Sequence, residues 1–195
     1  LRVWGPISLT LYAETAEEVT TDWSFFAKLG EMVAEGVPLN PVTGEAEIRP
    51  EISDDSIPGN VQVWSFGNLK AKYREVDESL SRPGMPWHPF CKEEKLSPST
   101  VYEFEIELMP VFKTFRKGCR LWLKVACDDP VFATWDNTSQ YVETPFIPER
   151  SEVRIHHNSK YPSHLLLPLV GAAPEVMRVD SPLKDAVPGA ARFVT

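Results

Sequence analysis

The sequence predicts an all-β domain in which two antiparallel sheets pack face to face as a sandwich. Apolar and polar residues alternate with a period of two in at least seven segments, and no segment has a convincing amphipathic helical period. Proline supplies 18 of the 195 residues, about twice the usual share of ~5%. Because proline removes a backbone donor and fixes φ, this content favours strand edges, turns and long loops over helices.

The alternation is clearest in Tyr102–Leu108, where three glutamates face one side and four large apolar groups face the other. Ile7–Tyr12 and Cys119–Val125 repeat the pattern. Further strands are predicted at Trp23–Leu29, Val61–Tyr73, Val153–His157 and Leu165–Val170. The best helical segment, Thr15–Val19, is expected to form a turn at most.

The length fits one domain. We expect the sandwich to occupy residues 1–170. Residues 171–195 lose the alternation and are predicted to be a C-terminal tail that packs on, or extends, the same domain. Three long connections, at 34–60, 81–99 and 128–150, are predicted to be loops rich in proline or polar residues. Loops longer than about 12–15 residues are uncommon unless they bind or cover something.

Composition excludes several classes of partner. The net charge of −8, with no block of Lys or Arg, would repel nucleic acid. No apolar run approaches the ~20 residues of a membrane span and no signal peptide opens the chain, so no membrane partner is expected. Three cysteines without framework spacing suggest thiols in a reducing compartment, and hence a cytoplasmic location, although secretion stays open. The chain opens inside a strand-like run without an initiator Met, which suggests a piece of a longer polypeptide.

The residues predict no catalytic site, metal site or cofactor. A G-x-S-x-G nucleophile elbow is absent because no two of the ten glycines stand four apart. His88 and Cys91 have the spacing of a zinc half-site, but no second half-site follows at a familiar spacing. The acidic pairs Asp54-Asp55 and Asp128-Asp129 do not resemble a calcium loop and are interpreted as solvated turn residues.

The six tryptophans leave one alternative function open, that of a free-standing carbohydrate-binding module. Trp87 and Trp135 lie in predicted loops, where flat rings can stack on sugars. Trp23, Trp64 and Trp122 lie in alternating segments, where packing in the core is the ordinary explanation.

Several segments, taken in order, resemble one family of domains. They are the opening strand Trp4–Tyr12, the second strand Thr21–Leu29, the strand and loop Lys70–Asp77 and Arg82–Pro89, and the late strands Phe115–Leu123 and Tyr161–Pro168. Together, over roughly residues 3–170, they resemble the C-terminal, non-catalytic domain of the X-prolyl dipeptidyl peptidase and cocaine esterase (CocE/NonD) hydrolases.

This resemblance implies a jelly-roll, galactose-binding-like sandwich that follows an α/β-hydrolase domain on the same polypeptide. The catalytic Ser, Asp and His would then belong to that upstream domain, and this chain would pack on it and help to shape the substrate cleft. The parent would hydrolyse esters or X-Pro peptides, and a homo-oligomer stays open.

We expect the contact with the hydrolase domain to involve the loop Arg82–Phe90. The candidate contact residues are Arg74, Arg82, Trp87, His88 and Phe90. Trp87 and Phe90 provide the apolar area that interfaces favour. Arg74, near the end of its strand, is expected to pair with Glu75, Asp77 or Glu78, or with a group on the hydrolase domain.

Overall fold

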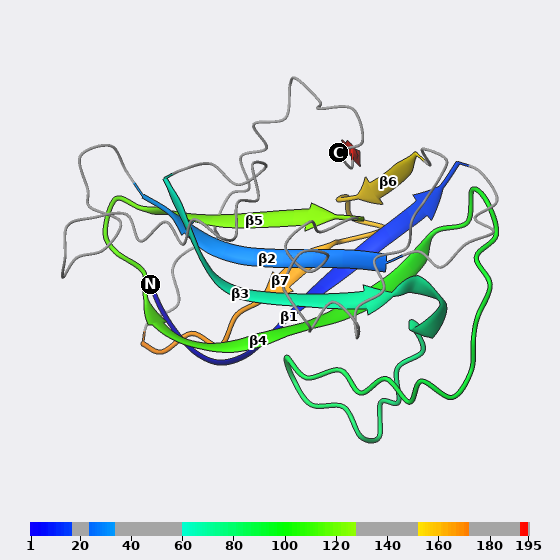
Figure 1. The fold of residues 1–195 in the computed structure, drawn as a ribbon, viewed down its shortest axis with the longest axis horizontal. Helices are drawn as coiled ribbons and strands as arrows, with labels where there is room; N and C mark the ends of the chain where they lie inside the picture. Colours follow the sequence, from blue (N-terminus) through cyan, green and yellow to red (C-terminus); the bar gives the residue numbers. More distant parts are fainter. Residues whose placement is uncertain (17–23, 34–59, 128–151, 172–191, 195) are drawn as a thin grey trace, which may run out of the picture.

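A computed structural model describes residues 1–16, 24–33, 60–127, 152–171 and 192–194 (Figure 1). The described residues form eight strands and one 3₁₀ turn. These are β1 Arg2–Thr15, β2 Ser24–Met32, β3 Val61–Lys70, η1 Ala71–Tyr73, β4 Tyr102–Thr114, β5 Arg120–Ala126, β6 Val153–His156, β7 His164–Leu166 and β8 Arg192–Val194. Trp23, the two acidic pairs, Trp135, residues 17–19 and nearly all of the predicted loops 34–60 and 128–150 lie outside the described residues.

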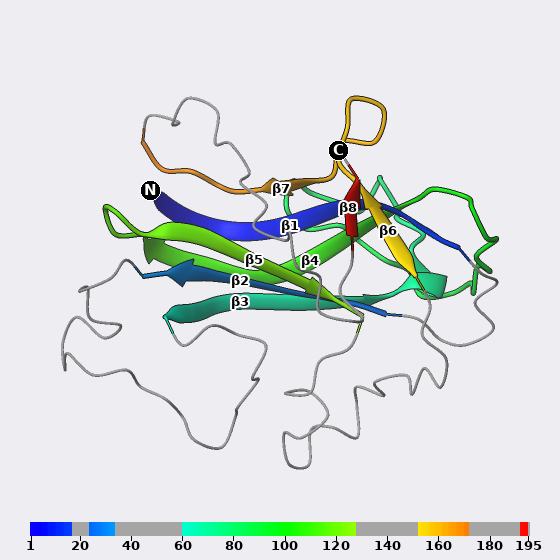
Figure 2. The same cartoon turned by 90° about the horizontal axis from the view of Figure 1, so that it is seen from above.

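The strands form two sheets that lie in two layers (Figure 2). The five-stranded sheet has the order β4-β1-β6-β8, and β7 also pairs with β1. The three-stranded sheet has the order β3-β2-β5. The described pairings are antiparallel except the parallel pair β6–β8. The prediction of an all-β fold with two packed sheets is therefore confirmed. No helix in the described part of the chain is long and apolar enough to cross a membrane.

The core lies between the two sheets and follows the predicted alternation. Phe104, Ile106 and Leu108 on β4 are fully buried, and the Phe104 ring meets Phe25 of β2 edge to face, with centroids 5.0 Å apart. Such an edge-to-face pair is favourable beyond its buried area. The middle strand β2 is buried along nearly its whole length, on both faces rather than on the single face that the alternation suggests.

The predicted strand Val61–Tyr73 is too long by three residues. β3 ends at Lys70, and Ala71–Tyr73 form the 3₁₀ turn η1. The carbonyl of Ala71 accepts a hydrogen bond from the Arg74 guanidinium at 3.2 Å. In the turn, this carbonyl therefore finds its partner three residues along the chain, whereas in a strand it would pair with the neighbouring strand.

Trp64 does not pack in the core, contrary to the sequence-based prediction. The β2–β3 register shifts by one residue, because Leu29 faces Ser65 while Gly30 faces Val63, and Trp64 is the extra residue. A β-bulge of this kind re-aims a side chain. The Lys113 Nζ atom lies 3.4 Å from the centroid of the exposed Trp64 ring.

The free edge of β4 is covered by other parts of the chain. An uncovered edge would present unpaired carbonyls to another chain. The Ser65 hydroxyl of β3 donates to the Met109 carbonyl at 2.6 Å. Two residues earlier, the Glu107 carbonyl lies so close to Gly67 that a Cβ built on this glycine would stand 1.9 Å from the oxygen. Thus β3 of one sheet packs directly against the edge of β4 of the other.

A buried carboxylate joins the two sheets at one end of the sandwich. Glu31 of β2 is 0% exposed, and Oε1 accepts a hydrogen bond from the Arg116 backbone N–H at 2.7 Å. Its Oε2 accepts from Arg116 Nη2 at 3.0 Å and lies 3.4 Å from Lys113 Nζ. Burial opposes ionisation of Glu31, but the hydrogen bonds from Arg116 and the charges of Lys113 and Arg116 outweigh it, so that the pKa of this carboxyl is lowered.

Candidate functional site

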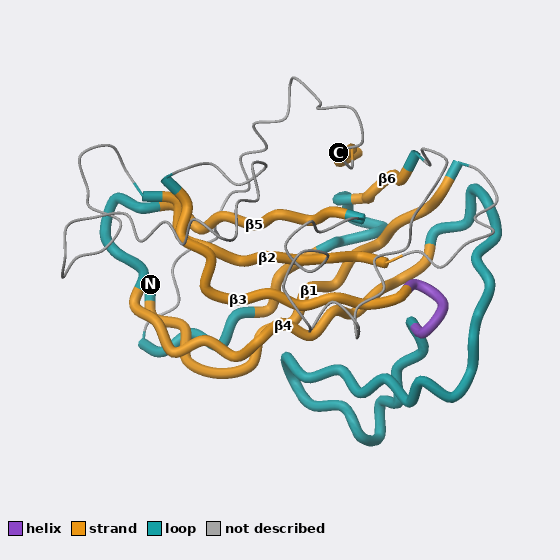
Figure 3. The backbone as a smooth tube through the Cα atoms, in the orientation of Figure 1, coloured by secondary structure: helices purple, strands orange, loops and turns teal. Residues whose placement is uncertain are grey.

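The predicted contact residues lie in one long connection, residues 74–101, between η1 and β4 (Figure 3). It leaves the sandwich beside the edge strand β4 and returns to begin that same strand. Three hydrogen-bonded anchors, at Arg74, His88 and Trp87, hold it in place.

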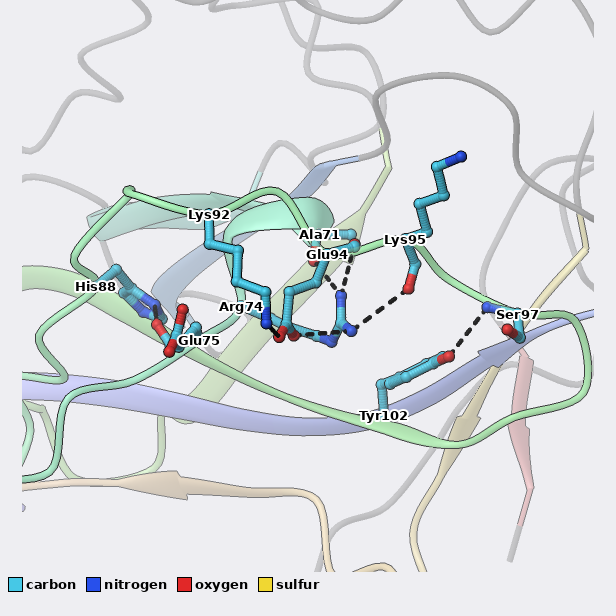
Figure 4. A network of polar contacts seen from close by, with 9 residues as sticks. All are labelled: Ala71, Arg74, Glu75, His88, Lys92, Glu94, Lys95, Ser97 and Tyr102. Atoms are coloured by element: carbon cyan, nitrogen blue, oxygen red, sulfur yellow. Dashed lines mark hydrogen bonds and ion pairs between the residues drawn. The ribbon is translucent and has the colours of Figure 1, made fainter.

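Arg74 anchors the far end of the connection to its beginning (Figure 4). Its Nη1 donates to the carbonyl oxygen of Glu94 at 2.9 Å, and Nη2 forms an ion pair with the Glu94 carboxylate, also at 2.9 Å. The guanidinium lies over the Tyr102 ring, with Cζ 4.4 Å from the centroid. This combination of planar stacking and several donors is specific to arginine.

The partner of Arg74 differs from the sequence-based expectation. None of the three acidic residues that follow it closely forms its ion pair; Glu94, twenty residues further along, does. The connection doubles back on η1, since the backbone N–H of Glu94 donates to the Lys72 carbonyl at 2.8 Å. A prediction based on neighbours in the sequence could not anticipate that the chain returns to η1. Arg74 therefore has a role inside the domain.

His88 ties the middle of the connection to the sheet edge. Its Nδ1 lies 2.9 Å from the Glu75 carbonyl oxygen, and its Nε2 lies 2.8 Å from the Glu105 carbonyl oxygen of β4. Because a carbonyl can only accept, a ring nitrogen donates to its carbonyl when it carries the proton.

The side chains of His88 and Cys91, which have the spacing of a zinc half-site, are both engaged in hydrogen bonds. Both nitrogens of His88 face carbonyl oxygens, and the Cys91 thiol donates to the Pro89 carbonyl at 3.1 Å. Within the described ranges, no group of three or more His, Cys, Asp or Glu residues could hold a metal ion.

Trp87 combines a fixed backbone with an exposed ring. Its N–H donates to the Ser81 hydroxyl at 2.9 Å, and its carbonyl accepts from the Asp77 N–H at 2.9 Å. The Ser81 hydroxyl in turn donates to the Asp77 carbonyl at 2.8 Å. The Trp87 side chain is nevertheless 54% exposed. The hydrogen bonds therefore present a large apolar surface at a defined place.

Arg82 is exposed and begins a tight turn. The backbones of Arg82 and Met85 exchange two hydrogen bonds, of 3.1 and 2.8 Å, around Pro83 and Gly84. Gly84 has φ +76°, which favours glycine. A Cβ built on it would lie 2.8 Å from the carbonyl oxygen of Pro6 in β1, so the turn rests directly on the five-stranded sheet.

Phe90 completes an apolar surface on the connection. It has φ +53° and is 61% exposed, and its ring centroid lies 5.6 Å from that of Tyr73 and 5.8 Å from that of His88. The exposed large apolar residues of the connection are Leu80, Met85, Trp87 and Phe90. Large exposed apolar side chains on an ordered connection make it a candidate surface for interaction.

We expect Arg74→Ala to destabilise the domain by about 2 kcal/mol, because charged hydrogen bonds to Glu94 are lost, and to make residues 88–97 more susceptible to proteolysis. Arg74→Lys keeps the charge but loses the planar stacking on Tyr102, and should recover only part of the stability. Denaturant unfolding and limited proteolysis measure both effects; full recovery by lysine would show that charge alone is required.

The fold and this surface define a class of protein, an all-β two-sheet domain with an ordered loop that exposes large apolar side chains. Among the described residues, no hydrogen bond joins a serine hydroxyl to a histidine ring: the Ser163 hydroxyl donates to the backbone carbonyl of His156, and His88 faces two carbonyls. The chain belongs to the family of X-Pro dipeptidyl-peptidase C-terminal non-catalytic domains, whose model matches residues 1–166. The resemblance drawn from the sequence is thereby confirmed.

Solved structures share the fold. A CocE/NonD family hydrolase from Staphylococcus aureus aligns over 87% of this chain with a TM-score of 0.55 and 23% identity. An aminopeptidase from a marine sediment Thaumarchaeota archaeon aligns over 88% with a TM-score of 0.55 and 20% identity. This chain spans only 28% and 24% of those two chains. A search of curated proteins found no match.

Proposed function

We propose that this chain packs on a catalytic α/β-hydrolase domain of the same polypeptide and helps to wall its substrate cleft. The family is one of C-terminal, non-catalytic domains, and the two similar structures are of chains about four times as long as the part that this chain matches. The observation that carries the proposal is the exposed Trp87 ring on a backbone fixed by hydrogen bonds from both sides.

The loop Arg82–Phe90 suits this role energetically. Ordering a flexible loop at an interface costs free energy, and a loop that is already ordered avoids most of that cost. Its prolines also restrict the unfolded chain. Tryptophan is among the residues that most often dominate the free energy of an interface. Trp87 and Phe90 therefore supply the apolar contact, and Arg82 of the same loop supplies an exposed charge.

The reaction proposed for the parent protein is hydrolysis of an ester or amide acyl bond through a serine acyl-enzyme. The serine, histidine and aspartate belong to the catalytic domain in this proposal. The cleft-facing loop of the present chain would act by positioning and by excluding water, through the exposed rings of Trp87 and Phe90.

A jelly-roll connectivity is part of the proposal. The chain passes repeatedly between the sheets: β1 lies in the five-stranded sheet, β2 and β3 in the other, β4 back in the first, β5 in the second, and β6 to β8 in the first. This alternation supports a jelly roll. The free-standing carbohydrate-binding module considered above is disfavoured by the family match; a glycan array on this chain tests it, and we expect no binding.

The experiment that tests the proposal is Trp87→Ala in the full polypeptide. We expect the interdomain contact to weaken by about 2 kcal/mol, the magnitude typical of a tryptophan hot spot, with a fall in kcat/KM. Leu123→Ala is the matched control, because Leu123 is 37% exposed on β5 of the opposite sheet. Its turnover should match that of the wild type, and any loss of stability should reflect only the truncation of a partly buried leucine away from the loop. Wild-type stability and turnover in Trp87→Ala would refute the proposal.

A further inference from the structure

A second apolar surface lies on the outer face of the five-stranded sheet, at the end where β1 begins. Trp4 of β1 and Phe112 of β4 are direct cross-strand partners. Their neighbours Val3 and Val111 are buried in the core, so Trp4 and Phe112 point away from it. Trp4 is 52% exposed and Phe112 is 78% exposed. The pair presents two large rings side by side on the outside of the sandwich.

The segment around β7 extends this surface on the other side of β1. Leu165, Leu167 and Leu169 pack against the core, so the residues between them face outward. The Trp4 N–H donates to the Pro168 carbonyl at 3.0 Å, which places Pro168 beside Trp4. We call the resulting surface the Trp4 face; it consists of Trp4, Phe112, Leu166, Pro168 and Val170.

The rest of the outer face is polar. Further along the same two strands, the outward cross-strand pairs are Ser8 with Glu107 and Thr10 with Glu105. Ser8 and Thr10 are nonetheless buried, with 5% and 6% of their surface exposed, so the part of this region that β1 contributes is polar but not open to solvent. The Trp4 face is apolar, and it lies only at the end of the sheet where β1 begins. This indicates a local contact surface rather than a general lack of polar residues on the outer face.

The Trp4 face adjoins the loop already described. The Pro83-Gly84 turn rests on Pro6, which stands two residues from Trp4 along β1. The Pro83-Gly84 turn of the loop therefore contacts β1 next to the Trp4 face.

We propose that the Trp4 face is the second half of the surface that docks on the catalytic domain, an inference that rests on the proposed function. In a family of C-terminal domains the catalytic domain precedes this one, so the linking chain would reach the sandwich at the start of its first strand, β1. Leu1 is held at this end of the sheet, because its carbonyl accepts from the Phe115 N–H at 2.7 Å. A domain linked there is kept at a high local concentration beside Trp4.

The amount of chain available also favours this occupant. In the two similar solved structures, about three quarters of the chain lies outside the region that this chain matches. The catalytic domain thus has ample surface to cover both the loop and the Trp4 face. A second copy of the chain and a glycan are the other possible occupants, and the experiment below separates them.

Hydroxyl-radical footprinting of the full polypeptide tests the inference. Trp4 and Phe112 report on the Trp4 face, Trp87 and Phe90 report on the proposed function, and Leu123 on the opposite sheet is the exposed reference. We expect Trp4 and Phe112 to be oxidised several-fold more slowly than their exposure in this domain implies, at any protein concentration, while Leu123 reacts as an exposed leucine.

The outcomes are separable. Protection of Trp87 and Phe90 without protection of Trp4 and Phe112 overturns the inference and leaves the proposed function standing. Reactivity at all four residues overturns both. Protection of the Trp4 face that disappears on dilution identifies a second copy as the occupant, and protection that appears only with added glycan identifies a sugar; either result also overturns the inference.

A variant gives an independent readout. Phe112→Ser should shift the equilibrium between docked and separated domains roughly 30-fold towards separation, as expected for truncation of an aromatic hot spot. Phe112 is exposed, so the domain itself should fold normally, and Leu123→Ser is the control for loss of an exposed apolar side chain. Small-angle scattering and limited proteolysis of the linking chain measure separation; a compact particle identical to the Leu123→Ser variant contradicts the inference.

Discussion

Gly67→Ala is expected to destabilise the sandwich by about 3 kcal/mol or more, the upper range for overpacking. The new methyl group would stand 1.9 Å from the Glu107 carbonyl oxygen, which belongs to the backbone of the adjacent sheet and cannot rotate away. To relieve the overlap, β3 must move off the edge of β4 and strain the Ser65–Met109 hydrogen bond. Thermal unfolding should show a fall in Tm of about 10 °C.

Gly118→Ala is the matched control for this substitution. Gly118 has φ +86°, but a Cβ built on it meets nothing within 4 Å. The alanine there should cost only the backbone strain, about 1 kcal/mol. If Gly67→Ala proved as mild as Gly118→Ala, the direct packing of β3 on β4 would be contradicted.

Glu31→Gln is expected to cost about 3 kcal/mol, because removal of one member of a buried ion pair leaves the other charges uncompensated. Glu31 is fully buried between Arg116 and Lys113, whose own side chains are largely buried. Glu93→Gln is the control, since Glu93 forms its ion pair with Lys72 at the surface and should contribute only ~0–1 kcal/mol. Chemical denaturation of both variants measures the difference.

The contribution of Glu31 to the free energy of unfolding should decrease as the pH falls. Its pKa in the folded protein lies below the usual 4.5, so the unfolded chain binds the proton more tightly than the folded one. The stabilisation is complete well above pH 4.5 and is lost as the pH falls through the lowered pKa of the folded state. The stability difference between wild type and Glu31→Gln should therefore shrink on acidification; a difference that grew would contradict the ion-pair assignment.

The strands were predictable because a strand with one buried face shows an alternation of apolar and polar residues within its own sequence. In Tyr102–Leu108 the alternation of glutamate with apolar residues specified both the strand and its buried side. The bulge at Trp64 was not predictable, because it arises from the register of β3 against β2, and alternation within one segment carries no information about register. Glu31 was missed for a related reason: its partners lie 82 and 85 residues away in the sequence.

The candidate surface was predictable only in part. Prolines and aromatic residues in Arg82–Phe90 pointed to an ordered loop, and Trp87 is exposed there. Arg74 was assigned local partners because proximity in sequence was the available guide, whereas the fold pairs it with Glu94. Trp4 and Phe112 meet only through the β1–β4 register, so the Trp4 face had no signal in the sequence.

We propose that this chain serves catalysis without performing it. The most direct test measures hydrolysis of an activated ester and of an X-Pro p-nitroanilide by this 195-residue chain, beside the full polypeptide at equal concentration. We expect the chain to hydrolyse both at the rate of buffer and the full polypeptide to turn over at least one of them. Turnover by the chain alone that is abolished by substituting one of its own serines or histidines would contradict the account.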